Sequence, residues 1–238
     1  NESGIITGKY TIVLNAFRRD DKAIFTLRYY AAHLDQLPDL DRLILLWNDY
    51  TRPIPKAFNS VLQSAEGRIL SVTPDCTNIS NRFRLFPEIR TQAIFSQDED
   101  LWYSPSALRG AFELWQEDPD AAVGFHPRLM KVSRERYFYK FQEAMESGVY
   151  NGLFATKGAF LHRKFYHLFF ADTRFAEVLA VVDEHTTGED IMMLFVHAIH
   201  TGKQSTIAVS ISHGIMGQDN SGNKKLSTST AKYRPLVM

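Results

Sequence analysis

The feature that most limits the fold of this chain is a repeated alternation of short apolar runs with longer segments of helical spacing. The apolar runs have the length and the near-continuous apolarity of strands that are buried on both faces. They span residues 11–17, 43–48, 68–72, 93–95 leading into Gln97, 122–125 and 206–211. Helical spacing covers residues 21–33, 105–115 and 188–200. This alternation predicts an α/β fold in which helices flank a mixed, mainly parallel sheet.

The length of 238 residues suits one α/β domain of ordinary size, or one domain with a small appendage. We expect residues 1–216 to form that domain. From residue 217 the chain is rich in Gly, Ser, Thr, Asn and Lys and has few apolar residues, so residues 217–238 are expected to form a flexible C-terminal segment.

Charge and cysteine content exclude several classes of protein. The 27 basic and 27 acidic residues give a formal net charge of zero, so no overall field attracts nucleic acid, and we expect no nucleic-acid partner. Cys76 is the single cysteine, which excludes an intrachain disulfide and zinc sites built from several thiolates. No apolar run approaches the roughly 18 residues of a membrane span, and the chain begins at Asn1, as expected for an excised or processed domain.

Three consecutive acids, Asp98, Glu99 and Asp100, follow the apolar strand expected at residues 93–95. The carboxyl ends of strands form the ligand-binding edge of an open α/β sheet, and a divalent cation with its phosphate ligand would neutralise acids gathered there. From an extended segment Asp98 and Asp100 would point the same way, so that one meets a metal ion and the other a sugar hydroxyl. The alternative is a solvated acidic turn that precedes a helix.

A second acidic pair, Glu189 and Asp190, stands beside Gly188 at the start of the helix expected over residues 188–200. The helix dipole favours carboxylates in a first turn, and that role alone would explain the pair. Because both acidic motifs stand at the ends of elements, they also fit a metal and nucleotide site that faces a reactive sugar carbon.

Amide and guanidinium side chains stand near the same expected sheet edge. Asn78 and Arg82, in the segment TNISNRFR, suit a uracil edge and a diphosphate, because planar Arg donors match phosphate oxygens in pairs. The alternative is a helix entry with surface arginines. Arg19 follows the first expected strand and Asn48 follows the second, which are corresponding positions for holding a nucleotide.

The histidines divide between a structural and a metal-binding interpretation. His197 and His200 lie on an expected helix among apolar residues, which favours a core or groove role over a metal site. His213 follows the last expected strand and is the better candidate, as an imidazole that would reach a metal ion held by Asp100. The sequence has no H-E-x-x-H, G-x-x-x-x-G-K-[ST] or G-x-S-x-G motif, which removes support for zinc protease, P-loop NTPase and serine hydrolase functions.

The order of these motifs resembles the exostosin-type glycosyltransferases of family 64, which include heparan sulfate enzymes and plant sphingolipid mannosyltransferases. The similarity runs from Tyr10 to about Ile211 through the segments TIVLNAFRR, LILLWND, SNRFRLFPEIRTQAIFSQDED, AFELWQEDPDAAVGFHPR, YNGLFATKGAFLHRKFY and GEDIMMLFVHAIHTGK. It implies a Rossmann-like GT-A fold and a Mn²⁺-dependent, retaining transferase. It also implies transfer of an N-acetylhexosamine, GlcNAc or GalNAc, from a UDP-sugar to a glycan or glycolipid acceptor.

The resemblance also implies a role for each matching residue. Asp100 corresponds to the metal ligand, and Asp190, preceded by Glu189, to the acid beside the anomeric carbon. The residues that correspond to the family's contacts with the donor are Arg19, Asn48, Asn78, Arg82, Asp98, Glu99 and Arg128. Thr187 and Gly188 stand where the family commonly has Asn-Cys, and no basic residue after Gly217 aligns with the family's own.

Two other functions stay open beside this one. Plant relatives point to a GDP-mannose-type hexosyltransferase that acts on a glycolipid. The divergent late motif and tail are compatible with a catalytically weak domain that only binds nucleotide sugars. The resemblance further implies a Golgi or endoplasmic reticulum lumen location, behind an N-terminal membrane anchor that this sequence does not contain, and it leaves homo- or heterodimerisation open.

Overall fold

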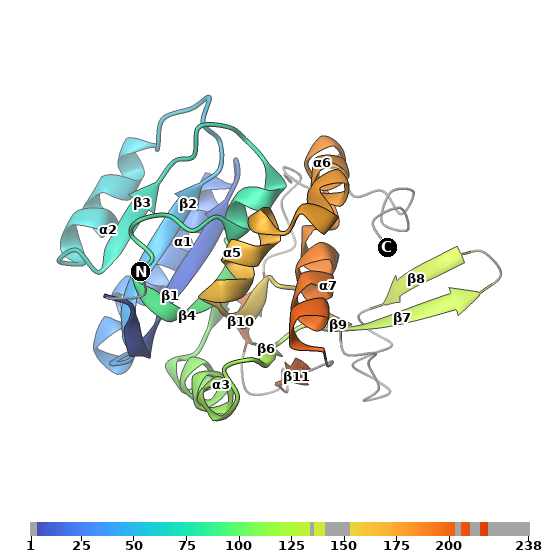
Figure 1. Cartoon of the computed structure of the whole chain (residues 1–238). Helices are drawn as coiled ribbons and strands as arrows, with labels where there is room; N and C mark the ends of the chain where they lie inside the picture. Colours follow the sequence, from blue (N-terminus) through green and yellow to red (C-terminus); the bar gives the residue numbers. More distant parts are fainter. Residues whose placement is uncertain (1–3, 134–135, 141–152, 203–205, 210–214, 219–238) are drawn as a thin grey trace.

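A computed structural model describes residues 4–133, 136–140, 153–202, 206–209 and 215–218 (Figure 1). Its main element is a seven-stranded sheet with the spatial order β11 (Thr206–Ala208), β6 (Ala122–Gly124), β10 (Gly158–His162), β4 (Thr91–Asp98), β1 (Ile6–Ala16), β2 (Leu40–Trp47) and β3 (Ile69–Val72). Within this sheet only β10 runs antiparallel to its neighbours, β4 and β6. The prediction of a mixed, mainly parallel sheet is therefore confirmed.

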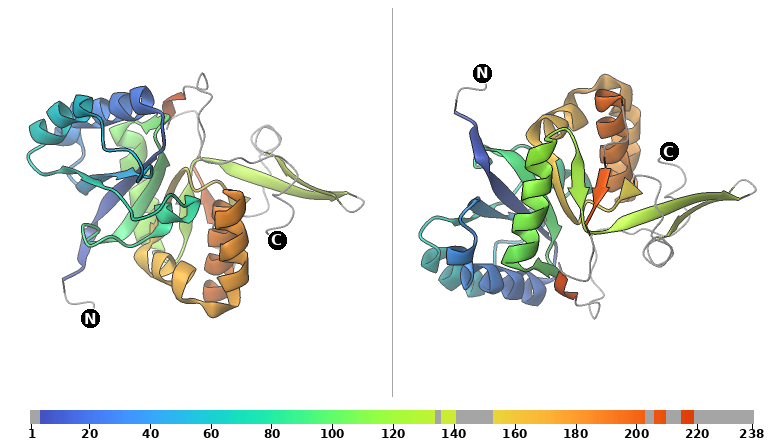
Figure 2. Two further views of the ribbon diagram at one scale, coloured as in Figure 1. Left: turned by 90° about the horizontal axis from the view of Figure 1, so that it is seen from above. Right: turned by 90° about the horizontal axis from the view of Figure 1, so that it is seen from below.

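In the described part of the chain, five further strands lie outside this sheet. β5 (Leu101–Tyr103) pairs with β12 (Ile215–Gln218), so the chain returns late in the sequence to the strand that follows β4. β7 (Pro127–Ser133) pairs with β8 (Arg136–Lys140) and with β9 (Leu153–Phe154). The β7–β8 hairpin projects away from the body of the domain (Figure 2).

Helices cover both faces of the sheet (Figure 1). One face packs against α1 (Asp20–Ala31), α2 (Asn59–Ser64) and α3 (Pro105–Glu117). The other packs against α5 (Arg163–Ala171), α6 (Ala176–His185) and α7 (Glu189–Thr201). Single turns of 3₁₀-helix lie at η1 (Leu34–Gln36), η2 (Lys56–Phe58), η3 (Ile79–Phe83) and η4 (Thr173–Phe175).

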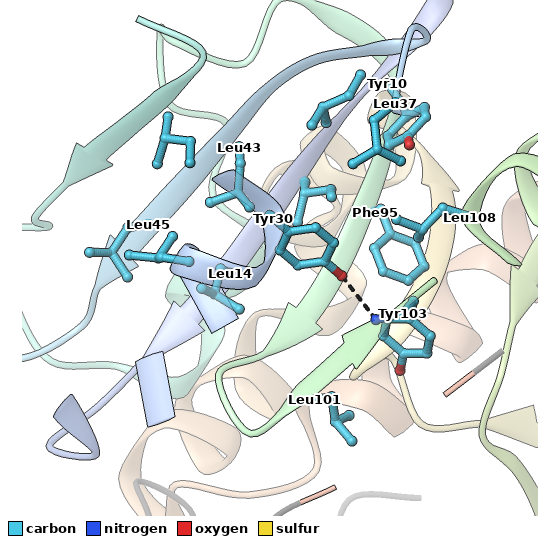
Figure 3. Packing of buried hydrophobic residues seen from close by; sticks show 14 of the residues in the cluster. Tyr10, Leu14, Tyr30, Leu37, Leu43, Leu45, Phe95, Leu101, Tyr103 and Leu108 are labelled. Carbon is cyan, nitrogen blue, oxygen red and sulfur yellow. Dashed lines mark hydrogen bonds between the residues drawn. The ribbon is translucent and has the colours of Figure 1, made fainter. Parts of the chain in front are cut away.

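The central strands supply side chains to two separate cores, because successive residues of a strand point to opposite faces. Leu43 and Leu45 of β2 pack toward α1, whereas Ile44 and Leu46 pack toward α5 and α7. All four side chains are fully buried. Figure 3 shows the first of these cores, in which the backbone amide of Tyr103 donates a hydrogen bond to the Tyr30 hydroxyl at 3.2 Å. Burial on both faces explains why these strands read as continuous apolar runs.

The structure confirms the six predicted strands and the three predicted helices, with ends that differ by a few residues. It also contains β10, α5 and α6, which the sequence pattern did not predict. The last predicted strand is shorter than expected: β11 ends at Ala208, and residues 210–211 lie outside the described part of the chain. Residues 217 and 218 belong to β12, while residues 219–238 of the predicted flexible segment also lie outside it.

The described helices include none with the length and apolarity needed to cross a lipid bilayer.

Candidate functional site

The carboxyl ends of β1, β2 and β4 meet at one edge of the sheet because the three strands are parallel neighbours. Asn15 near the end of β1 is paired with Asp98 at the end of β4. The amide of Asn48, just after β2, donates to the carbonyl of Ala16 at 2.9 Å. Arg19, Asn48 and the acidic triplet are therefore gathered at this edge, as the sequence predicted.

The acidic triplet spans the end of β4 and the turn that follows it. Asp98 is the last residue of β4, and Glu99 and Asp100 form the turn into β5. The side chain of Gln97 donates to the carbonyl of Leu101 at 2.5 Å, and the Thr26 hydroxyl donates to the carbonyl of Glu99 at 2.8 Å. These bonds fix the turn against α1.

The three carboxylates of the triplet do not face one partner. Asp98 pairs with the guanidinium of Arg82, whereas Glu99 and Asp100 both pair with Arg19, each at 2.6 Å. The extended segment expected to include both Asp98 and Asp100 ends at Asp98, since Glu99 and Asp100 form a turn, and the two aspartates pair with different arginines. The alternative of a freely solvated acidic turn is also wrong for Glu99, whose residue is 3% exposed.

Burial and neighbouring charges separate the proton affinities of these acids. Burial raises the pKa of Glu99 to about 7, although the Arg19 guanidinium acts in the opposite direction. Burial also opposes ionisation of Asp98, but the charges of Arg82 and Lys157 outweigh it and hold the pKa of Asp98 below its usual value. The site therefore places an ionised carboxylate beside one whose proton is lost near neutral pH.

Arg82 joins the two acidic motifs that lie far apart in the sequence. It belongs to η3, is 5% exposed, and pairs with Asp98 through one nitrogen and with Glu189 through the other, the latter at 2.9 Å. The alternative of a surface arginine is therefore wrong for Arg82. The second acidic pair lies in the same site as the triplet.

Glu189 and Asp190 begin α7, after Gly188 in a left-handed conformation with φ of 87°. This conformation suits glycine and lets the chain turn sharply from α6 into the site. Burial, with the neighbouring charge of Asp190 second, raises the pKa of Glu189 to about 7. One Asp190 carboxylate oxygen accepts the amide of Ile191 at 2.9 Å, so this acid also serves the first turn of α7.

An amide network holds Asn48 and Asn78 beside Arg82. Asn48 donates to the carbonyl of Asn78 and accepts from the side-chain nitrogen of Asn81, both at 2.8 Å. Asn78 donates to Asp183 of α6 at 3.0 Å, and Ser80 donates to the same carboxylate through its amide at 3.2 Å and its hydroxyl at 2.8 Å. Asp183 thus ties η3 to α6.

Arg128, the last residue assigned to the donor, lies in β7. Its guanidinium donates to the backbone carbonyls of His126 and Pro127 at 3.4 and 3.1 Å.

A cavity of about 240 Å³ adjoins the triplet, between α1 and β5. It is lined by Asp21, Lys22, Phe25, Glu99, Asp100 and Trp102.

The histidine predictions have different outcomes. His197 is 1% exposed, and its Nε2 lies 2.7 Å from the carbonyl oxygen of Asp120, so the core interpretation is confirmed for this residue. His200 lies on the outer part of α7 and pairs with Asp172 at 2.7 Å. His213 lies outside the described residues, so its predicted metal contact stays a prediction.

The described residues contain no cluster of three or more His, Cys, Asp or Glu side chains that would hold a metal ion by themselves. Asp98 and Asp100 nevertheless place carboxylate oxygens at the sheet edge, with side chains 25% and 14% exposed. Such oxygens fit an ion that one or two carboxylates share with substrate phosphates.

A mixed α/β sheet with this order and this polar edge is the GT-A type of fold found in glycosyltransferases. Among solved structures, S. aureus TarS 1-349 in complex with UDP-GlcNAc is similar, with a TM-score of 0.54 and 8% identity. The match covers 93% of this chain and 61% of that one, and at this identity it shows the fold.

Sequence similarity defines the family. The model of the Glycosyl transferase family 64 domain matches residues 10–234, and the chain belongs to this family. Exostosin-like 2 of Mus musculus is 30% identical over 205 residues, covering 84% of this chain and 60% of that protein. Glycosylinositol phosphorylceramide mannosyl transferase 1 of Arabidopsis thaliana is 26% identical over 203 residues, covering 79% and 59%. The chain thus spans about 60% of these relatives.

Sequence reasoning missed two residues that complete the site. Asp183 lies in α6 among residues that read as an ordinary helix surface, and only the tertiary structure places it against Asn78 and Ser80. Lys157 precedes β10, and its positive charge helps to lower the pKa of Asp98. A weak signal was present for Lys157, since it stands directly before the apolar run of residues 158–161.

Proposed function

We propose that this domain is a metal-dependent, retaining glycosyltransferase that transfers an N-acetylhexosamine, GlcNAc or GalNAc, from a UDP-sugar to a glycan acceptor. The observation that carries the proposal is the double contact of Arg82 with Asp98 and Glu189. It brings the triplet, suited to the donor diphosphate, together with the late acidic pair, suited to the sugar carbon. Family membership and the exostosin-like relatives support the reaction class.

The donor would lie across the carboxyl edge of β1, β2 and β4. In this proposal Asn48 and Asn78 contact the uracil, because their amides belong to a network fixed in position. Arg19, Arg82 and Arg128 supply guanidinium groups to the diphosphate side, and Asp98 and Glu99 accept hydroxyls of the ribose and the donor sugar. Donor binding then requires Arg19 and Arg82 to exchange part of their contacts with carboxylates for contacts with phosphate.

Asp100 is the residue we assign to Mn²⁺, with His213 as a further candidate. A bound Mn²⁺ supplies Lewis-acid stabilisation of the negative charge on the departing diphosphate. The protein's own contribution is to present the Asp100 carboxylate from a turn that is bonded to α1 and β5. Arg19 holds that carboxylate in place until the donor arrives.

Asp190 and Glu189 are the residues we assign to the reacting sugar. As the bond to the diphosphate breaks, positive charge develops on the sugar, and a carboxylate at its face stabilises that charge. Attack by the acceptor hydroxyl on the face left by the diphosphate retains the configuration. Asp190 would supply the carboxylate, and Glu189, with its pKa raised to about 7 by burial, would remain paired with Arg82 behind it.

A second donor class is favoured by one specific similarity. The Arabidopsis thaliana relative is named a glycosylinositol phosphorylceramide mannosyl transferase and matches 79% of this chain. A GDP-mannose-type transfer to a glycolipid is therefore the alternative reaction. A domain that binds nucleotide sugars with little catalysis is the other alternative. For cellular location we propose the Golgi or endoplasmic reticulum lumen, and a homo- or heterodimer is compatible with each reaction.

Turnover of defined donors tests the proposal. We expect the chain with MnCl₂ to release UDP slowly from UDP-GlcNAc or UDP-GalNAc without acceptor, and GDP not at all from GDP-mannose. Asp190→Ala is expected to lose the release while still binding UDP, and Asp100→Ala to lose binding. Release from GDP-mannose alone would favour the alternative donor. Binding of UDP with no release or transfer on any acceptor would contradict the enzyme proposal and favour a binding domain.

A further inference from the structure

Lys157 stands opposite the acidic triplet, directly before β10, and it was not among the residues assigned a role from the sequence. In the β10–β4 ladder Gly158 is paired with Gln97 and Ala159 with Ser96. The same antiparallel register places Lys157 opposite Asp98. Residues opposite one another in an antiparallel pair extend to the same side of the sheet, with Cβ atoms about 5 Å apart. The Lys157 side chain therefore starts on the same side as the carboxylate of Asp98.

The charges that act on the Lys157 ammonium group belong to residues of the same site. The pKa of Lys157 is lowered, chiefly by burial, with Asp98 and Asp100 acting against that effect and Arg128 and Arg82 adding to it. These four groups belong to β4, the turn after it, β7 and η3. These charges agree with the strand register, which places Lys157 at the site.

Among the described residues Lys157 has no ion pair and no side-chain hydrogen bond, which distinguishes it from the arginines around it. Arg82 is held by Asp98 and Glu189, Arg19 by Glu99 and Asp100, and Arg128 by backbone carbonyls. A half-buried ammonium group loses part of its hydration. This loss costs free energy unless an anion pairs with the ammonium group and accepts its hydrogen bonds. Of these four cations, Lys157 is the one whose side chain has no acceptor among the described residues.

The buried side chain of Tyr103 fixes the backbone of Lys157. The Tyr103 hydroxyl donates to the carbonyl of Lys157 at 3.3 Å and lies 2.8 Å from Nε2 of His126. The same hydroxyl fills the space where a side chain of residue 158 would begin, since a Cβ built on Gly158 would lie 1.9 Å from it. Tyr103 and Phe125 are fully buried and stacked, with ring centroids 4.7 Å apart. The lysine is therefore presented from a rigid base.

We propose that Lys157 binds the diphosphate of the nucleotide-sugar donor, opposite Arg82 and Arg19. The ligand class is a nucleoside diphosphate or its sugar ester, and the inference rests on the proposed function for the presence of that donor. Lysine is suited to this role because its ammonium is a compact charge with three donors that follow a phosphate as it moves. From its position just before β10, it supplies charge beside Asp98, in addition to that of Arg19, just before α1, and Arg82 of η3.

Comparison of UDP with uridine tests the inference, since the two ligands differ only in the diphosphate. Calorimetry on the full chain with MnCl₂ is expected to show that Lys157→Met weakens UDP binding by about 10-fold to 100-fold, while uridine binding changes less than twofold. Lys157→Arg, which keeps the charge, is expected to stay within about threefold of wild type for both ligands. Lys9→Met, an exposed lysine at the opposite end of β1, is the matched control and should leave both affinities unchanged.

The outcomes separate this inference from the proposed function. Equal UDP binding by wild type and Lys157→Met overturns the role of Lys157, even if the enzyme transfers sugar. Equal weakening of UDP and uridine also overturns it, because a structural defect would affect both ligands alike. Selective loss of UDP binding in a protein that shows no transfer would support Lys157 and contradict the proposed reaction. Absence of any nucleoside diphosphate binding by the wild type would contradict both.

Discussion

Arg82 and Glu189, separated by 107 positions in the sequence, form a buried ion pair at 2.9 Å. The same guanidinium also holds Asp98, the last residue of the central strand β4. One side chain thus fixes the position of the late acidic pair relative to the triplet. The contact ties helix α7 to the sheet and sets the distance between the two acidic motifs.

Removing this guanidinium is expected to destabilise the domain. In Arg82→Met two carboxylates at a buried position lose their cation, and breaking a buried pair in this way costs about 3–5 kcal/mol. Urea denaturation at pH 7 measures the change. Arg84→Met is the control two residues away: its pair with Asp75 is exposed, at 40% and 84% for the two side chains, so a loss below about 1 kcal/mol is expected. Similar small losses in both variants would contradict the bridging role of Arg82.

The raised pKa of Glu189 predicts a pH dependence of stability. Its pKa is about 7 in the folded protein, chiefly through burial, against 4.5 for the unperturbed group. Between these values the folded state binds more protons than the unfolded state, so the free energy of unfolding falls as pH rises through this window. Glu189→Gln removes this contribution. The variant should therefore gain stability relative to wild type, by about 2–3 kcal/mol, as pH rises from about 4.5 to 8.

Denaturation curves of both proteins across this pH range provide the measurement. Glu177→Gln, on the exposed face of α6, is the control and should follow wild type within about 0.5 kcal/mol at each pH. A constant difference between Glu189→Gln and wild type over the whole range would show that Glu189 does not hold its proton in the folded state.

Gly158 is expected to tolerate no side chain. A Cβ there would lie 1.9 Å from the Tyr103 hydroxyl and 2.6 Å from its ring carbon Cζ, and such overpacking costs about 1–3 kcal/mol or more. Removing the hydroxyl relieves part of the clash. The double variant Gly158→Ala with Tyr103→Phe should therefore lose less stability than the sum of the two single variants, by about 1 kcal/mol or more.

Gly110 provides a matched comparison for this substitution. It lies within α3 and a Cβ there meets no atom within 4 Å, so Gly110→Ala should stabilise the domain by about 0.5–1 kcal/mol. Thermal unfolding of the four variants measures both effects. Strict additivity of the Gly158 and Tyr103 substitutions would contradict the close approach of the hydroxyl to residue 158.

Asp183 is expected to position η3 without touching the donor. In Asp183→Ala the side chain of Asn78 and both donors of Ser80 lose their acceptor, which predicts a stability loss of about 1–3 kcal/mol. Hydrogen exchange should show faster exchange of the Ser80 amide, and UDP affinity should fall because Asn78 and Arg82 are held less firmly. Glu184→Ala, an exposed neighbour, should change neither. Unaltered exchange at Ser80 in Asp183→Ala would contradict this role.

The fold was predictable where burial dictates composition. Both faces of β2 are covered, so its residues Leu43 to Leu46 are all apolar. Such an uninterrupted apolar run can be recognised from one sequence alone. The direction of β10 was not predictable, since the five residues of this strand carry no mark of whether they run parallel or antiparallel to β4. Pairing between strands far apart in sequence is settled by tertiary packing.

The site was predictable as a set of residues but not as a set of contacts. The acids at the end of β4 and the start of α7 stand out because carboxylates interrupt or open apolar elements. That Arg82 joins Asp98 to Glu189, and that Arg19 engages Glu99 and Asp100, depends on the turn after β4 and on the packing of α7. The roles assigned to these residues in donor and metal binding stay predictions.

A crystal structure of the chain with UDP-GlcNAc and MnCl₂, with anomalous diffraction to locate manganese, tests the central claim most directly. The account predicts one manganese peak within coordination distance of the Asp100 carboxylate, a diphosphate between that ion and Arg82, and the sugar carbon facing Asp190. Nucleotide and manganese bound elsewhere, with Arg19 still paired to Glu99 and Asp100 and Arg82 still paired to Asp98 and Glu189, would contradict it.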